Sequence, residues 1–313
     1  MRLTALALLV VLAQAVPPAG APQASDGTIV SQTECEFPRY EAASAFTKRH
    51  YPQNEYEAAA RSTTVECRRI RYLSGGLQVV GFIVQPRRVP GARLPVIVYN
   101  RGGFRDIGKL DSWNLLDFYG FAARGFIVLA SQYRGSDGGE GRDEVGGADV
   151  ADVMALTRIA ARLPNADTSN LFLYGLSRGG IMTFLALRRG FPARAAAVVG
   201  ALFDGEAAAR RAPKVVASAF KDNPDYAARG TALLRDRTVM NWPELVNVPV
   251  LIVHGANDVE VPATEAMAFA TKLADLGKKY ELIIYAADNH EATSNRKDRD
   301  ARIAAWFKQH IGS

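Results

Sequence analysis

The residues best suited to chemistry lie in the stretch 171–180, which reads LFLYGLSRGG. A short apolar run ends at Tyr174, a glycine-rich turn follows, and a helical pattern begins at Gly180. A G-x-S-x-G sequence between a strand and a helix is typical of a nucleophile elbow, a tight turn that exposes the serine hydroxyl. The pattern predicts that Ser177 is a nucleophile and that the helix directs its first N–H groups toward a developing oxyanion. The alternative is a glycine-rich turn whose serine only caps the helix.

A serine nucleophile needs a general base, and the sequence offers four histidines for that role. His50 lies in a polar N-terminal segment, His310 lies in the last helical turn, and His254 ends an apolar run as a buried residue would. His290 stands in a loop after the last predicted strand, residues 280–285. Because open α/β sheets build their sites at the carboxyl ends of strands, His290 is the predicted base. The alternative for His290 is an exposed loop residue without a catalytic role.

The carboxylate that orients the base should lie between the nucleophile and the base in the sequence. The loop after residues 248–253 reads HGANDVEVP and offers Asp258 and Glu260. Asp258 is nearer to the end of the strand, whereas Glu260 is close to Pro262, where a carboxylate could simply favour the start of a helix. We therefore expect Asp258 to hold one tautomer of His290 and to stabilise its imidazolium form.

An oxyanion requires hydrogen-bond donors that are in place before the reaction begins. One predicted donor is the backbone N–H of Arg178, the residue directly after the nucleophile. The second should come from the loop after residues 94–99, which reads NRGGF. Its glycines allow the backbone to approach a substrate closely. The alternative is that this loop is an ordinary turn.

The remainder of the chain supplies the strands and helices that would position these residues. Two apolar runs at residues 65–73 and 77–85 are joined by SGG, which is a hairpin signal. From residue 94 onward, apolar runs alternate with helical stretches. The predicted strands are residues 94–99, 125–131, 171–174, 195–202, 248–253 and 280–285, and the predicted helices are residues 111–124, 148–163, 180–189, 263–276 and 298–310. A hairpin followed by repeated βα units predicts an α/β fold with a mostly parallel, doubly wound sheet and antiparallel N-terminal strands.

Three segments stand outside this alternation. Residues 1–15 combine a positive charge, an apolar core and an A-x-A site, which predicts a cleaved signal peptide and a secreted or periplasmic protein. The apolar core is too short for the alternative, a membrane anchor. Residues 16–64 are predicted to form a flexible and partly helical extension before a catalytic domain at residues 65–313. Within that domain, residues 204–247 separate two strands and are predicted to form a helical lid over the strand ends.

Composition excludes several classes of partner. The chain has 313 residues, a formal net charge of +6 and 48% hydrophobic residues, as in an ordinary globular protein. Its basic residues are scattered without interleaved aromatic residues, so we expect no nucleic-acid partner, and we expect no stable membrane insertion. The glycine-rich stretch 135–147 lacks the spacing of either nucleotide-binding loop. The predicted chemistry requires no cofactor, and no cluster of metal ligands is evident in the sequence.

The two cysteines, Cys35 and Cys67, both lie in the part of the chain that would be exported. In an oxidising compartment such a pair is expected to form a disulfide. It would close a loop of about 33 residues and stabilise the fold by about 3–4 kcal/mol on the chain-entropy model. The alternative is a pair of unlinked buried thiols.

Taken together, the motifs resemble the catalytic domain of the prolyl oligopeptidase family, the serine peptidase branch of the α/β-hydrolase superfamily. The motifs are YNRGGF (99–104), QYRGSDGGEG (132–141), GLSRGG (175–180), HGANDVEVP (254–262) and NH (289–290). The resemblance covers about residues 65–311. It implies that Ser177, Asp258 and His290 are nucleophile, acid and base. That family places its acid four residues after the histidine of the HG motif, which supports Asp258 over Glu260.

The chain departs from that family's pattern in three places. Arg178 stands where the family commonly has tyrosine, but only the backbone of this residue is required. Members that resemble prolyl oligopeptidase itself use a tyrosine hydroxyl in the oxyanion hole, and Arg101 occupies that position here. The second donor is therefore the guanidinium of Arg101 or a backbone N–H of Gly102 or Gly103. Too few residues precede the sheet for the family's N-terminal β-propeller, so size selection would depend on residues 204–247 or be absent.

The predicted function is that of an exported serine hydrolase of the prolyl oligopeptidase type, which cleaves small peptides through an acyl-enzyme. The same groups would serve a carboxylesterase, and no pair of glutamates of the dipeptidyl-peptidase kind can be assigned to anchor a substrate amine. A non-catalytic binding module with this fold is a third possibility, which an intact Ser, Asp and His in the right order disfavours. The expected partner is thus a small peptide or an ester, and the sequence makes no prediction of oligomeric state.

Overall fold

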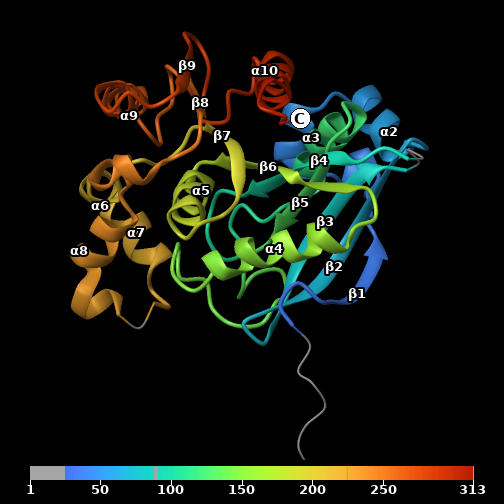
Figure 1. The fold of residues 1–313 in the computed structure, drawn as a ribbon, viewed down its shortest axis with the longest axis horizontal. Helices are drawn as coiled ribbons and strands as arrows, with labels where there is room; N and C mark the ends of the chain where they lie inside the picture. Colours follow the sequence, from blue (N-terminus) through green and yellow to red (C-terminus); the bar gives the residue numbers. More distant parts are fainter. Residues whose placement is uncertain (1–24, 88–90, 224, 313) are drawn as a thin grey trace, which may run out of the picture.

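The computed structural model describes residues 25–87, 91–223 and 225–312 and consists of helices packed on both faces of one large sheet (Figure 1). The predicted signal peptide at residues 1–15 lies outside the described residues. The sheet has nine strands in the order β1-β2-β3-β5-β4-β6-β7-β8-β9. The strands are β1 (Ile29–Glu34), β2 (Val65–Ser74), β3 (Leu77–Pro86), β4 (Leu94–Asn100), β5 (Ile127–Ser131), β6 (Ala166–Leu176), β7 (Ala193–Val199), β8 (Val250–Gly255) and β9 (Tyr280–Tyr285).

The pairing of the strands confirms the predicted α/β class. The pairs β1–β2, β2–β3 and β3–β5 are antiparallel, whereas every pair from β5 through β4 to β9 is parallel. The chain leaves β4 for β5 on one side and returns to β6 on the other side. This reversal of strand order makes the carboxyl ends of β4 and β6 a topological switch point, where sites form in open α/β sheets.

Helices cover the sheet on both faces, as a doubly wound fold requires. The helices are α1 (Ala45–His50), α2 (Gln53–Ala60), α3 (Ser112–Ala123), α4 (Val150–Arg162), α5 (Arg178–Arg188), α6 (Gly205–Arg211), α7 (Pro213–Ala219), α8 (Tyr226–Arg237), α9 (Ala263–Asp275) and α10 (Arg296–Gln309). Helices α4, α5 and α9 share one apolar core with the sheet, and α3 and α10 share the other. Of the helices in the described ranges, none has the length and hydropathy of a membrane span.

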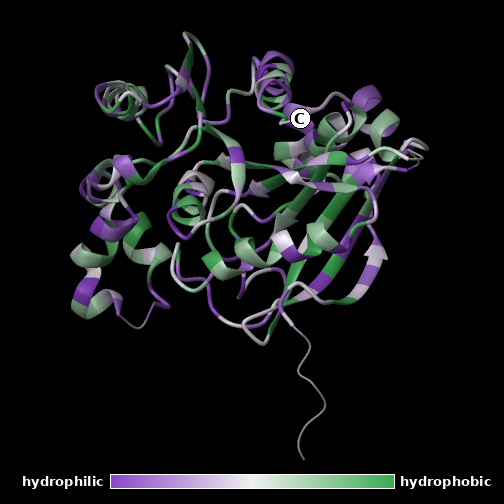
Figure 2. Cartoon of the chain, viewed as in Figure 1, coloured by the Kyte–Doolittle hydropathy of each residue, from purple (hydrophilic) through white to green (hydrophobic). Residues whose placement is uncertain are grey.

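Side chains of β4 show how the sheet divides these two cores. Val96 and Val98 belong to the core beneath α4, α5 and α9, whereas Ile97 and Tyr99 belong to the core beneath α3 and α10. Successive strand residues point to opposite faces, so a strand that is covered on both sides must be apolar throughout. Figure 2 accordingly shows the central strands as largely hydrophobic.

The N-terminal extension differs in part from the prediction for residues 16–64. The predicted helical character is present in α1 and α2, but residues 29–34 also form β1, an edge strand antiparallel to β2. The sequence IVSQTE gives no sign of this strand because only Ile29 is partly buried and the following residues are exposed. Main-chain pairing holds β1, and a disulfide between Cys35 and Cys67 joins the end of β1 to β2. The Cys35 N–H also donates to the Cys67 carbonyl oxygen, at 3.0 Å.

The insertion at residues 204–247 is helical, as predicted. It consists of α6, α7 and α8 with two short 3-10 helices, Val239–Asn241 and Pro243–Leu245, between β7 and β8 (Figure 1, orange). A small apolar cluster includes Ala219 and Phe220 of this insertion together with Phe104 and Val145 of the main domain. The insertion therefore packs directly against the loop that follows β4.

Candidate active site

The turn between β6 and α5 has the geometry of a nucleophile elbow. Ser177 adopts φ 55° and ψ −123°, a backbone conformation that is strained for any residue with a side chain. A methyl group on Gly179 would lie 1.9 Å from the Asn100 carbonyl oxygen, and one on Gly175 would lie 2.4 Å from the Gly179 carbonyl oxygen. Glycine is therefore required at both positions, because α5 folds back tightly over β6.

Asp258 lies between two histidines after β8. Its Oδ2 is 2.7 Å from Nδ1 of His290 and 3.0 Å from Nε2 of His254. Its Oδ1 accepts hydrogen bonds from the N–H groups of Glu260 and Val261, at 2.8 and 2.9 Å. Burial would raise the pKa of Asp258, but the hydrogen bonds from the two histidines outweigh burial and hold that pKa well below its ordinary value.

His290 is held in the tautomer that a general base requires. Because Nδ1 donates its proton to Asp258, Nε2 of the neutral ring carries a free lone pair. This Nε2 is buried and has no hydrogen-bond partner among the described residues. Burial would lower the pKa of His290, yet the hydrogen bond and charge of Asp258 raise it above the ordinary value. Glu260 faces the other nitrogen, with Oε2 3.7 Å from Nε2, and its side chain is 65% exposed.

The loop that carries the base is organised by a carboxylate that the sequence analysis did not identify. Buried Asp288 accepts hydrogen bonds from the backbone N–H groups of Asn289, Ser294 and Asn295 and from the Asn295 amide, at 2.8–3.0 Å. The Asn257 N–H donates to the Asp288 carbonyl oxygen at 2.9 Å, which ties the acid and base loops together. Only its position two residues before the base could have indicated this role.

The nucleophile and the base lie against the same strand end. The Ser177 N–H donates to the Val199 carbonyl oxygen at 2.9 Å, and the Leu202 N–H donates to the Ser177 carbonyl oxygen at 3.3 Å. Between these two contacts lies Gly200, where a methyl group would be 2.2 Å from the carbonyl oxygen and 3.1 Å from Nδ1 of His290. The end of β7 therefore brings together two residues that are far apart in the sequence.

The loop after β4 lies on another side of the nucleophile. A methyl group on Gly102 would be 3.1 Å from Cβ and 3.7 Å from Oγ of Ser177, so this backbone passes directly beside the hydroxyl. The N–H groups of Gly102 and Arg178 donate to no other group in the part of the chain that the structure describes. Both predicted backbone donors are thus adjacent to the nucleophile.

The side chain of Arg101 does not fit its predicted role as an oxyanion donor. It is 1% exposed, and its guanidinium lies behind the loop. The guanidinium donates to carbonyl oxygens of Gln132, Gly102 and Arg105 and to Oγ of Ser136, at 2.6–3.0 Å. Its N–H groups are therefore occupied in holding the loop. The sequence identifies a charged residue in a loop but not the direction in which its side chain points.

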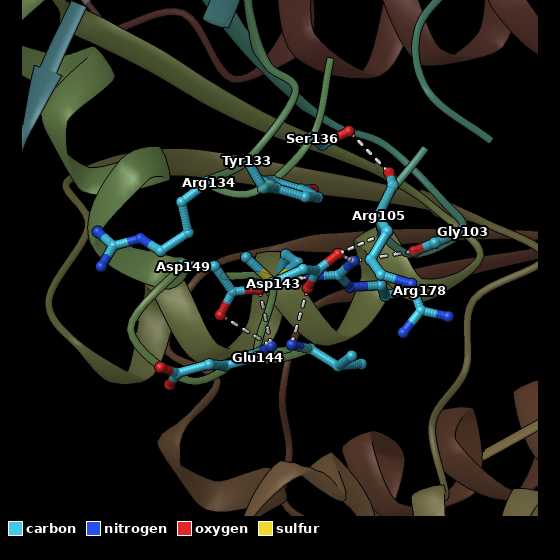
Figure 3. Close-up of polar contacts among 12 residues, drawn as sticks. Gly103, Arg105, Tyr133, Arg134, Ser136, Asp143, Glu144, Asp149 and Arg178 are labelled. Carbon is cyan, nitrogen blue, oxygen red and sulfur yellow. Dashed lines mark hydrogen bonds and ion pairs between the residues drawn. The ribbon is translucent and has the colours of Figure 1, made fainter. Parts of the chain in front are cut away.

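The side chain of Arg178 also has contacts that the sequence analysis missed. It is buried behind the elbow, where it forms ion pairs with Asp143 and Asp149 (Figure 3). The sequence predicts a role only for the backbone N–H of Arg178, and the glycine-rich stretch 135–147 carries no local sign that Asp143 pairs with the Arg178 side chain. Within the described ranges, no group of His, Cys, Asp and Glu side chains is arranged to hold a metal ion.

Comparison with known families explains why these features occur together. A family model described as the prolyl oligopeptidase family matches residues 112–313, which is more than half of the chain. The chain belongs to this family. It is therefore a serine hydrolase with an α/β-hydrolase fold, and the resemblance inferred from its motifs is confirmed.

The chain matches very different shares of its relatives. The uncharacterized peptidase YtmA of Bacillus subtilis is 29% identical over 248 residues, which cover 76% of this chain and 92% of that protein. The human acylamino-acid-releasing enzyme is 24% identical, and the match covers 76% of this chain but 34% of that enzyme. The chain thus spans nearly the whole of one relative and about a third of the other.

Solved structures show the same fold at lower identity. An acylaminoacyl peptidase of Pyrococcus horikoshii superimposes with a TM-score of 0.67 and 20% identity, and the match covers 80% of this chain and 42% of that one. An acetyl xylan esterase from Paenibacillus sp. R4 superimposes with a TM-score of 0.62 and 18% identity, covering 80% of this chain and 86% of that one. Peptidases and esterases therefore share this framework.

Proposed function

We propose that this member of the prolyl oligopeptidase family is an exported hydrolase of small peptides, with Ser177 as nucleophile, His290 as base and Asp258 as acid. One observation carries the proposal. His290, whose Nδ1 is fixed by Asp258 and whose Nε2 has no hydrogen-bond partner among the described residues, packs against Gly200 at the same strand end that binds the strained Ser177. A nucleophile, a base within its reach and a group that orients the base are the elements of covalent serine catalysis.

The reaction would proceed by acyl transfer. Nε2 of His290 accepts the hydroxyl proton as Oγ of Ser177 attacks the carbonyl carbon, which gives a tetrahedral intermediate. The N–H groups of Gly102 and Arg178 donate hydrogen bonds to its negatively charged oxygen. The imidazolium then gives its proton to the leaving amine, and the bond to that amine breaks. Water repeats the sequence on the acyl-enzyme and releases the acid.

Peptides and esters are the two substrate classes that the comparisons support. The peptidase proposal is supported by the relatives that are named as peptidases. One solved neighbour is an acylaminoacyl peptidase in complex with Z-Gly-Gly-Phe-chloromethyl ketone. The acetyl xylan esterases favour the alternative of a carboxylesterase, because this chain matches 85–86% of their length. The deciding experiment compares kcat/KM for p-nitrophenyl esters and peptide p-nitroanilides, with Ser177→Ala as the control. Because p-nitrophenyl esters are intrinsically more reactive than p-nitroanilides, a larger value for esters is expected of a peptidase as well. Turnover of esters with no turnover of any peptide p-nitroanilide would replace the peptidase proposal with the esterase alternative.

Selection of small substrates is proposed to come from the helical insertion at residues 204–247. The insertion contacts the loop after β4, because the Arg105 side chain donates to the Ser218 carbonyl oxygen at 2.9 Å and pairs with Asp222 at 3.1 Å. The expected result is turnover of short peptides without cleavage of a folded or denatured protein such as casein. Equal cleavage of casein and short peptides would contradict this role.

Export is proposed from residues 1–15 and from the disulfide between Cys35 and Cys67. Disulfides persist mainly in oxidising compartments. Expression of the full chain in a Gram-negative host should give a protein in the periplasmic fraction whose mass lacks the first 15 residues. Full-length protein that remains in the cytosol would contradict the proposal.

A further inference from the structure

Three successive carbonyl groups in the loop after β4 are held from behind by buried side chains. Oη of Tyr133 donates to the Arg101 carbonyl oxygen at 3.3 Å, and Nη1 of Arg101 donates to that of Gly102 at 2.9 Å. Nη1 of Arg178 donates to the carbonyl oxygen of Gly103, also at 2.9 Å. The C=O and N–H of a trans peptide point in opposite directions. Fixing the Arg101 and Gly102 oxygens therefore turns the N–H groups of Gly102 and Gly103 away from the buried side chains. Arg178 fixes the next peptide, between Gly103 and Phe104.

Arg178 is the member of this set that joins the loop to the nucleophile elbow. Its guanidinium pairs with both oxygens of Asp143 at 2.7 Å and with Asp149 at 2.5 Å, and it stacks over the Tyr133 ring at 4.8 Å (Figure 3). Oδ2 of Asp143 also accepts a hydrogen bond from the Arg105 N–H at 2.7 Å. One carboxylate thus contacts both the residue after the nucleophile and the loop that faces it.

Burial limits how much this cluster of ion pairs can stabilise the fold. The contribution of Arg178, Asp143 and Asp149 is therefore a fixed geometry. The side chain of Arg178 is 6% exposed and both carboxylates are fully buried. A buried ion pair gains little net stability over apolar residues of the same volume, because desolvation offsets the attraction. A bidentate arginine–carboxylate pair is nevertheless rigid and directional. Although burial would raise the pKa of Asp143, the charge of Arg178 holds it below its ordinary value, so the pair stays ionised.

We propose that the Arg178 side chain, fixed by Asp143, is a positioning residue for the oxyanion hole. It holds the loop at residues 101–105 against the elbow through the Gly103 carbonyl oxygen, so that the Gly102 N–H is in place beside Ser177. The side chain does not contact substrate and acts through the loop. This inference rests on the proposed acyl transfer at Ser177.

The test compares Arg178→Lys and Arg178→Met with a matched control, Arg134→Lys. Arg134 forms an equally short ion pair with Asp152, at 2.7 Å, but its side chain donates only to Asp152 and Ser74 among the described residues. Loss of one oxyanion donor lowers kcat by about 10²–10³-fold in serine hydrolases. A displaced donor should cost less, so we expect the Arg178 variants to lose about 10–100-fold in kcat with KM changed less than about 3-fold. Arg134→Lys should lower Tm while kcat stays near that of the wild type.

A tetrahedral inhibitor separates positioning from a general loss of stability. The inhibition constant of a peptidyl trifluoromethyl ketone should rise in the Arg178 variants in proportion to the loss of kcat/KM, because this adduct carries the oxyanion. If the Arg178 variants do not fold, Asp143→Asn and Tyr133→Phe test the same loop, and each should raise this inhibition constant with little change in KM.

The outcomes distinguish this inference from the proposed function. If the wild type turns over substrate and Ser177 is labelled, but the variants keep wild-type kcat, the positioning role is wrong and the proposed function stands. Equal losses of kcat in Arg178→Lys and Arg134→Lys would also overturn it. If the wild type shows neither turnover nor labelling, the proposed function fails, and the inference fails with it.

Discussion

Two buried arginines support opposite sides of the site. Arg178 lies behind the loop after β4 and donates to the Gly103 carbonyl oxygen at 2.9 Å. Arg299, on α10, lies behind the base loop and donates to the Glu291 carbonyl oxygen, one residue after the base, at 2.6 Å. Each guanidinium is buried and paired with two carboxylates, which for Arg299 belong to Asp117 and Asp300.

The two sides differ in what else holds the loop. The base loop has an independent support, because Asp288 accepts four hydrogen bonds from groups within it. In the loop after β4, Tyr133, Arg101 and Arg178 each hold a different carbonyl group. Loss of Arg299 therefore leaves the base loop with a second support, Asp288. Loss of Arg178 leaves the Gly103 carbonyl oxygen without a donor among the described residues. The contribution of a buried ion pair to function therefore depends on which loop it holds and on what else holds that loop.

The largest effect on the base side is expected from Asp258→Asn. This change keeps the shape of the side chain but removes the charge that fixes the tautomer of His290 and stabilises its imidazolium, so kcat should fall by about 10⁴-fold. Steady-state kinetics on a peptide p-nitroanilide measure it. The neighbouring Glu260→Gln is the control and should lower kcat less than about 5-fold. A loss of kcat in Glu260→Gln that exceeds the loss in Asp258→Asn would mean that Glu260 is the acid.

A smaller loss is expected when the support of the base loop is removed. Asp288→Ala leaves four donors without their acceptor, which lets His290 leave its position and lowers kcat by about 10–100-fold. The matched control is Asp167→Ala. Asp167 lies in the first part of β6, at the end of the strand away from Ser177, and accepts hydrogen bonds from Ser169 and Asn170. Wild-type kcat in folded Asp288→Ala would show that this loop is held by other contacts.

Arg299→Lys tests whether Arg299 and Arg178 contribute differently to activity. Lysine keeps the charge but cannot make the bidentate contacts, so we expect the free energy of unfolding to fall by about 2 kcal/mol. Because Asp288 still holds the base loop, kcat should change less than about 3-fold. Chemical denaturation and steady-state kinetics give both quantities. A loss of kcat as large as that of Arg178→Lys would show that the two arginines have equivalent roles.

The smallest expected effect is a shift of the pH profile in Glu260→Gln. The charge of Glu260 contributes to the raised pKa of His290, so its removal lowers that pKa. His290 must be neutral to act as base, so the acidic limb of kcat/KM should move to lower pH. Oε2 of Glu260 is 3.7 Å from Nε2 of His290 and the Glu260 side chain is largely exposed to water, so we expect the limb to move by about half a pH unit. A shift to higher pH would contradict the placement of Glu260 beside Nε2.

Local patterns in the sequence were sufficient to predict the fold and the family. The apolar run before Ser177, the glycines around it and the strand before His290 are readable because each depends on neighbours in the chain. The catalytic roles of Ser177, Asp258 and His290 remain predictions, although the structure places the last two in contact.

Contacts between distant segments were beyond the sequence analysis. The Arg178 side chain meets residues 35 and 75 positions earlier in the chain, and no local pattern records such a contact. The direction of the Arg101 side chain depends in the same way on Gln132, 31 positions away. Strand β1 was missed because an exposed edge strand needs main-chain partners but no apolar face. The sequence therefore predicts the groups that line the site but not the buried side-chain contacts that hold its loops.

Activation of Ser177 is measured most directly by the intact mass of the protein after reaction with a fluorophosphonate probe. We expect one adduct on the wild type and none on Ser177→Ala, because only a hydroxyl activated by His290 reacts rapidly with the phosphorus atom. Circular dichroism of both proteins confirms that each is folded. An unlabelled wild type, or an adduct that persists in Ser177→Ala, would contradict the assignment of Ser177 as the nucleophile.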